Sequence, residues 1–86
     1  MSESLESARE HHQRGELALA IQGYGAFLDS DPARADVWHL KGLAEHQSGE
    51  LEAALQSAER AIEAGGEKAP YLLLRGHVLQ DRKSVV

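Results

Sequence analysis

Histidine is the residue type whose number first suggests chemistry in this sequence, since five occur in 86 residues. Imidazoles ligate metal ions and transfer protons near neutral pH. His11 and His12 are adjacent, so on a helix they would point in different directions, and His39 and His46 are seven residues apart. Glu45 precedes His46, but no second histidine follows four residues later, so the H-E-x-x-H zinc motif is absent. We therefore expect no metal site and no cofactor.

Other catalytic signatures are also missing from the sequence. It contains no G-x-S-x-G nucleophile motif and no glycine-rich phosphate loop. Glu50, Glu52, Glu59 and Glu63 are spaced as one solvated face of a helix rather than as a catalytic pair. Because the sequence has no cysteine, thiol nucleophiles, thiolate metal sites and disulfides are excluded. We expect that the chain is not an enzyme.

Composition limits the classes of partner. A hydrophobic content of 42% with 27% charged residues is typical of a globular domain. Nine Lys and Arg against fourteen Asp and Glu give a net charge of −5, which opposes binding to nucleic-acid phosphates. Apolar runs such as 71–74 are far shorter than the roughly 20 residues of a membrane span, and the acidic N-terminus lacks the features of a secretory signal. The sequence predicts a single cytoplasmic domain over 1–86, without a nucleic-acid or membrane partner.

The sequence repeats itself with a period of 34 residues. Residues 12–22 (HQRGELALAIQ) and 46–56 (HQSGELEAALQ) agree at seven of eleven positions. The same offset relates Ala8 to Gly42 and then to Gly76, which indicates a third copy. The period divides the chain into repeats at 1–34 and 35–68 and a partial repeat at 69–86.

Each complete copy is predicted to form two helices, because apolar residues recur at spacings of three and four between polar and glycine positions. Gly15 and Gly49 can close helices in the left-handed conformation, and Asp31-Pro32 is a helix start signal. No stretch shows the polar and apolar alternation of a strand. The sequence predicts an all-α fold of five helices, near 2–14, 16–30, 34–48, 50–64 and 69–82.

This pattern resembles the tetratricopeptide repeat (TPR) family, whose signature runs W-x2-L-G-x2-Y, then A-x3-F, then P over 34 residues. The second copy has W-x2-K-G-x2-E over 38–45, where Lys41 and Glu45 replace the leucine and the tyrosine. The first copy has A-x3-Y-x7-P over 20–32, and the third has L-x2-R-G-x2-L over 72–79. The resemblance therefore covers two full repeats and the first helix of a third.

The resemblance implies a right-handed superhelical array of antiparallel helix pairs, in which the first helix of each copy lines a concave surface. Small residues would let neighbouring helices approach closely, at Ala8, Ala20, Gly42, Ala54, Ala61 and Gly76. It also implies a non-catalytic protein-interaction scaffold that binds a peptide or partner segment in the concave groove. The expected groove residues are Leu5, Arg9, His12, Gln13, His39, Leu40, Leu43, His46, Gln47, Leu73, Leu74 and His77.

The third copy lacks its second helix, since the positions that correspond to Gly15-Glu16-Leu17 read Lys83-Ser84-Val85. Side chains that would pack on that helix therefore need another cover. Either the chain is the front portion of a longer protein, or a second copy of the chain covers the last helix as a homodimer. Accordingly, the alternative functions are a self-association module and an accessory region of a larger enzyme. The residues expected to carry self-association are Leu72, Leu79, Val85 and Val86.

Overall fold

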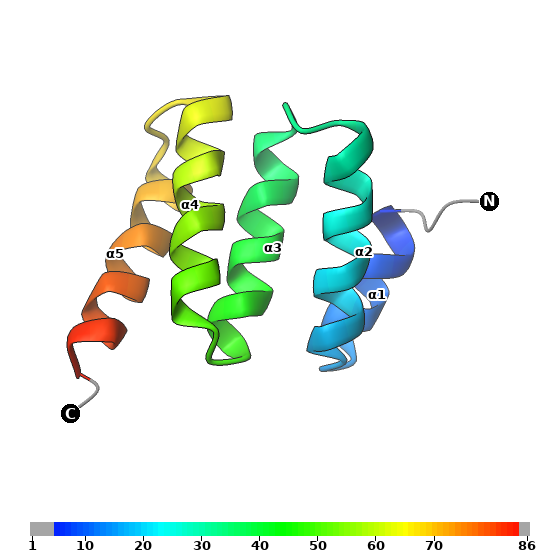
Figure 1. The fold of residues 1–86 in the computed structure, drawn as a ribbon, viewed down its shortest axis with the longest axis horizontal. Coiled ribbons are helices and arrows are strands. Elements are labelled where there is room, and N and C mark those ends of the chain that lie inside the picture. Colours follow the sequence, from blue (N-terminus) through cyan, green and yellow to red (C-terminus); the bar gives the residue numbers. More distant parts are fainter. Residues whose placement is uncertain (1–4, 85–86) are drawn as a thin grey trace.

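Five α-helices form the part of the chain that the computed structural model describes, residues 5–84 (Figure 1). They are α1 (Leu5–Gln13), α2 (Leu17–Ser30), α3 (Ala35–Gln47), α4 (Leu51–Gly65) and α5 (Ala69–Ser84). No strand occurs in these residues, so the all-α prediction is confirmed there. α5 continues two residues beyond its expected end at Arg82, and the expected start of the first helix at Ser2 lies outside the described residues.

The turns after α1 and after α3 have the same geometry. Gly15 and Gly49 adopt φ of 80° and 84°, the left-handed region that glycine enters without a steric cost. In both turns the residue after the glycine donates its N–H to the carbonyl five residues earlier, at 2.9 Å. The two predicted glycine helix ends are confirmed, and the sequence period of 34 is repeated in the backbone.

The connection between α2 and α3 differs from the predicted one. The Asp31 N–H donates to the Phe27 carbonyl at 3.0 Å, so Asp31 belongs to the last turn of α2. Pro32 then lies in a turn, where its fixed φ is favourable, and α3 begins only at Ala35 after Arg34, which provides no side-chain cap. The prediction that Asp31-Pro32 starts a helix is therefore wrong, because Asp31 caps the end of α2 and Arg34, not Asp31, precedes the first residue of α3.

Consecutive helices run antiparallel and pack side by side, with α3 between α2 and α4 (Figure 1). α5 packs on α4 and also contacts α3. The molecule is elongated, about 42 × 27 × 17 Å, and α1 and α5 lie toward opposite ends of its long axis (Figure 1). An array built in this order leaves its two end helices with neighbours on fewer sides than α3.

The core is made mostly of small side chains at the helix contacts. One cluster joins α1, α2 and α3 through Ala8, Ala20, Tyr24, Leu28, Val37 and Ala44. A second joins α4 and α5 through Ala54, Ala58, Leu74 and Val78. Alanine and glycine at such contacts allow helix axes to approach at the short end of the usual 8 to 10 Å.

Five of the six small residues predicted at close helix contacts are buried; they are Ala8, Ala20, Gly42, Ala54 and Ala61. The prediction is wrong for Gly76, which is exposed. A Cβ atom built on Gly76 would meet no atom within 4 Å, because no helix of the described residues covers that side of α5.

Lys41 and Glu45, the two residues that depart from the repeat signature, form an ion pair with each other. Glu45 is only 3% exposed, and its Oε2 accepts a hydrogen bond from Lys41 Nζ at 2.7 Å. Its Oε1 accepts from the Ser57 hydroxyl on α4 at 2.6 Å. A buried carboxylate needs both a countercharge and hydrogen-bond donors. One ion pair on α3 and one hydroxyl on α4 supply them.

Candidate functional site

The helices α1, α3 and α5 are linked along one face by two hydrogen bonds of the same kind. His12 Nε2 bonds to Gln47 Oε1 at 2.9 Å, which joins α1 to α3. His46 Nε2 bonds to Asp81 Oδ2, which joins α3 to α5. Each link connects residues 35 positions apart. His46 and Asp81 follow His12 and Gln47 by 34 residues, so the two links occupy equivalent positions in consecutive repeats. All of the predicted groove residues lie on these three helices.

A cavity of about 220 Å³ opens on this face between α1, α2 and α3. Four of the five residues that line it were predicted for the groove: Arg9, His12, Gln13 and Leu40. The fifth, Tyr24, comes from α2 and was missed, since only the first helix of each copy was expected to contribute. Its side chain is fully buried, and its hydroxyl reaches His12 Nδ1 at 2.9 Å.

Hydrogen bonding determines what His12 can do in this cavity. Burial raises the pKa of the Tyr24 hydroxyl, against a smaller opposite effect of Arg9, so the phenol stays protonated and can donate to His12 Nδ1. The imidazole proton is then on Nε2, which donates to the amide oxygen of Gln47. Both ring nitrogens are thus used within the chain, and His12 shapes the wall of the cavity rather than offering a free polar group.

Arg9 and Gln13 provide the exposed polar groups of the cavity. Leu40 provides its apolar surface and is itself partly buried, because it packs against the first core cluster. The arrangement is an apolar patch flanked by a guanidinium and a carboxamide, which suits an apolar side chain next to hydrogen-bond acceptors.

Three other predicted groove residues contribute mainly to packing. Leu5 packs against the first core cluster and Leu43 against the second. The His39 ring lies on Tyr71 of α5, with ring centroids 5.3 Å apart, and burial lowers the pKa of His39. None of the three residues lines the cavity; Leu5 packs within the helices that carry it, whereas Leu43 and His39 join α3 to α4 and α5.

Leu73 and His77 lie apart from the first cavity, on the side of α5 away from the core. Leu73 is 60% exposed, and both residues line a shallow apolar cavity of about 490 Å³. The other lining residues are Ala69, Leu72, Gly76 and Gln80. The predicted groove residues therefore divide between two surfaces.

The groove prediction is wrong at Leu74. This side chain is only 2% exposed and belongs to the second core cluster with Val78. It points to the position where Gly42 of α3 has no side chain, and a Cβ on Gly42 would lie 2.7 Å from Leu74 Cδ2. A leucine packed against a glycine of the neighbouring repeat is not available to a ligand.

Two of the residues predicted for self-association are on the open side of α5. Leu72 is partly buried and Leu79 is 37% exposed. Val85 and Val86 lie outside the described residues.

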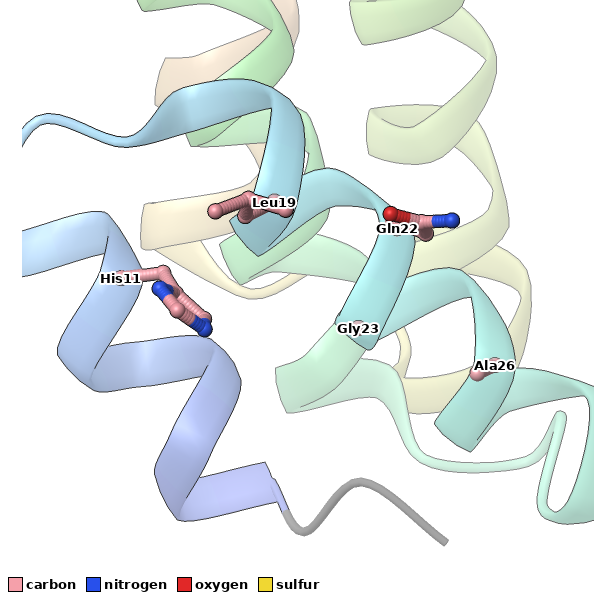
Figure 2. Close-up of a pocket in the computed structure, with 5 residues that line it drawn as sticks. All are labelled: His11, Leu19, Gln22, Gly23 and Ala26. Carbon is pink, nitrogen blue, oxygen red and sulfur yellow. The ribbon is translucent and has the colours of Figure 1, made fainter.

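Two further cavities were not predicted. One of about 470 Å³ lies beside Trp38, whose indole N–H donates to the Pro32 carbonyl at 2.8 Å. Lys41 and Arg60 each lie 5.8 Å from the centroid of this indole ring. The other, of about 300 Å³, lies between α1 and α2, and Figure 2 shows its lining of His11, Leu19, Gln22, Gly23 and Ala26.

Residues 5–84 form neither a metal-binding cluster nor a membrane-spanning helix. Within that part of the chain, His, Asp and Glu side chains form no group of three or more that could hold a metal ion. None of its helices is both long enough and apolar enough to cross a membrane.

Comparison with known proteins finds no protein-family model that matches this chain and no curated protein with significant similarity to it.

Proposed function

We propose that the chain is a non-catalytic protein-interaction scaffold of the TPR type, which binds a peptide segment along the face of α1, α3 and α5. The observation that carries this proposal is the cavity in which Arg9 and Gln13 flank the apolar surface of Leu40. Peptide-binding sites commonly combine an apolar anchor position with a few fixed polar groups.

Repetition of the geometry supports a TPR-type superhelical array. The glycine turns, with φ of 80° and 84°, and the two links of 35 residues each recur once per repeat. Ala20 and Ala54, which are equivalent positions 34 residues apart, are both fully buried. An array that repeats the same contacts rotates by a constant angle per repeat, and such rotation creates an extended concave surface.

The polar groups of the cavity indicate the chemistry of the ligand. His12 is held by Tyr24 and Gln47, so recognition falls to the exposed Arg9 and Gln13. Arg9 forms no salt bridge with any other described residue. We propose a peptide whose apolar side chain packs on Leu40 beside an acidic side chain that pairs with Arg9.

The experiment is selection of peptide ligands by display on the immobilised chain, followed by calorimetric titration of variants. Arg9→Glu should weaken binding by about tenfold or more, as expected for loss of a charged contact. Arg14→Glu is the matched control, because Arg14 is also exposed, just after the end of α1, but does not line the cavity. Circular dichroism should show the same helicity for both variants.

Two results would contradict the proposal. One is that Arg14→Glu weakens binding as much as Arg9→Glu, which would indicate a general charge effect. The other is a selection that yields no peptide whose binding depends on Arg9.

A further inference from the structure

The cavity beside Trp38 lies on the opposite side of α3 from the cavity that Leu40 lines, which we call the peptide cavity. Successive residues of a helix turn by about 100°, so Trp38 and Leu40 are about 200° apart around α3. The cavity beside Trp38 has a volume of about 470 Å³, to which α2 contributes Gly25 and Asp29 and α4 contributes Arg60. A ligand in one of these cavities therefore does not occupy the other.

An equivalent cavity occurs one repeat later, between α4 and α5. It has a volume of about 350 Å³ and is lined by Glu59, Ile62, Glu63 and Arg75. Each of these residues follows a lining residue of the cavity beside Trp38 by 34 positions. Glu59 stands where the first cavity has Gly25, and Leu72 is the equivalent of Trp38. The cavity beside Trp38 thus differs from its equivalent by an aromatic ring and by the lack of a side chain at Gly25.

Gly25 leaves space beside Trp38 that the packing of the chain does not require. It lies in the interior of α2, where glycine lowers helix stability relative to residues with a side chain. A Cβ on Gly25 would meet only Lys41 Cε, at 3.7 Å, which is an ordinary van der Waals contact. Glycine at this position therefore keeps the cavity open at a cost in helix stability, and a conserved volume of this kind suits a ligand.

Two side chains of opposite charge are free in this cavity. The Asp29 carboxylate comes from α2 and the Arg60 guanidinium from α4, and both residues are exposed. Neither forms a salt bridge with another residue of 5–84. The ammonium of Lys41, in contrast, is already bonded to Glu45 at 2.7 Å. The cavity therefore offers one free charge of each sign, on the two helices that flank Trp38.

We propose that this cavity is a second binding site, for a peptide segment of mixed charge from a partner protein. An acidic side chain of the segment pairs with Arg60, a basic side chain pairs with Asp29, and an apolar side chain between them packs on Trp38 beside Gly25. A segment with charges of one sign only would place one of them next to a like charge. Trp and Arg are also the residue types that most often dominate the binding energy of an interface.

Fluorescence measures binding at this site directly, because Trp38 is the only tryptophan of the chain. The probes are capped tetrapeptides in which two leucines are flanked by a lysine at one end and a glutamate at the other, in both orders. Matched peptides carry two glutamates or two lysines instead. A mixed-charge peptide should change the fluorescence with a Kd below about 1 mM, and both matched peptides should bind about tenfold more weakly or less.

Charge reversal at Arg60 should change which peptide binds. In Arg60→Glu both free charges of the cavity are acidic, so the mixed-charge peptide should lose about tenfold in affinity and the peptide with two lysines should gain. Arg14→Glu is the matched control, because Arg14 is also exposed but does not line this cavity. Arg9→Glu should leave the titration unchanged as well, which separates this site from the peptide cavity.

Gly25→Gln tests the open space without changing the charge. Its side chain should fill the cavity and reduce affinity by about tenfold or more, while the thermal midpoint of unfolding rises because glutamine is a better helix former than glycine. A loss of binding together with a gain in stability cannot come from unfolding. Gly76→Gln is the matched control, since Gly76 is an exposed glycine of α5 outside this cavity.

Three results would overturn the proposal. One is that no mixed-charge peptide changes the fluorescence of Trp38 up to about 5 mM. Another is that the peptide with two glutamates binds as tightly as the mixed-charge peptides, which would indicate an acidic partner and no role for Asp29. The third is that Gly25→Gln keeps the full affinity of the unsubstituted chain.

Discussion

α3 and α5 occupy equivalent places in consecutive repeats, but their surroundings differ. Gly42 of α3 is buried against α4 and α5, whereas Gly76 of α5 faces open space. Glu45 of α3 is 3% exposed, whereas Leu79, its equivalent on α5, is 37% exposed. Here the charged residue is inside and the apolar residue is outside, because burial depends on whether a neighbouring helix covers the position. Substitutions at equivalent positions of the two helices should therefore have unequal effects.

The largest difference is expected between Glu45→Ala and Leu79→Ala. Glu45→Ala leaves the Lys41 ammonium without its carboxylate and the Ser57 hydroxyl without its acceptor, so we expect a loss of about 3 kcal/mol in the free energy of unfolding. Leu79→Ala removes a side chain that is already part exposed and should cost less than about 1 kcal/mol. Urea denaturation followed by circular dichroism measures both values.

A double variant tests the cause of the loss at Glu45. Replacing Lys41 with Met together with Glu45 with Leu removes the ion pair as a unit, although the Ser57 hydroxyl still loses its acceptor, and should cost less than Glu45→Ala alone. Equal losses for Glu45→Ala and Leu79→Ala would show that the contrast between α3 and α5 has no energetic consequence.

The next largest difference is expected between Gly42→Leu and Gly76→Leu. A Cβ on Gly42 would lie 2.7 Å from Leu74 Cδ2 and 3.3 Å from Ser57 Cβ, so Gly42→Leu should overpack the core and cost about 2 kcal/mol. Gly76→Leu adds a better helix former in open space and should raise monomer stability by about 0.5 to 1 kcal/mol. Thermal or urea unfolding at low protein concentration measures both, and effects of the same sign would contradict this interpretation.

The smallest effect is expected from the titration of His39, which α5 partly covers. Burial lowers the pKa of His39, so the folded chain binds this proton less readily than the unfolded chain does. The contribution of neutral His39 to stability is then present above about pH 6.5 and lost as the pH falls through the lowered pKa of the folded state. His39→Phe should remove this part of the pH dependence. Unfolding curves from pH 7.5 to 5 measure it, and an unchanged pH profile in the variant would contradict the effect of burial.

Local features of the fold were predictable, whereas contacts between repeats were predictable only in part. Gly15 and Gly49 end helices as predicted, since a positive φ is a property of the residue and its turn. The start signal at Asp31-Pro32 was misread because a turn at 32–33 separates it from α3, which begins only at Ala35. Leu74 was placed in the groove because helical spacing does not show which side chain meets the gap left by Gly42.

The candidate site shows the same division. Arg9, His12, Gln13 and Leu40 were predicted together and line one cavity. Tyr24 was missed because it reaches the cavity from α2, and the hydrogen bonds that occupy His12 come from residues 12 and 35 positions away. The partners of each bond lie on different helices, so the apolar spacing within one helix does not reveal them.

The amino-acid sequence by itself determined the period of 34, because similar residues recur at that offset. It also determined the five helices and the glycine turns, because these depend on residues within a few positions of one another. Only the tertiary structure decided which of the equivalent positions in the repeats are buried and which are exposed. It paired Glu45 with Ser57, put Leu74 into the core, and left Gly76 uncovered. Burial and hydrogen bonding between repeats depend on which helix lies next to a position, and equivalent residues in a repeat need not have equivalent neighbours.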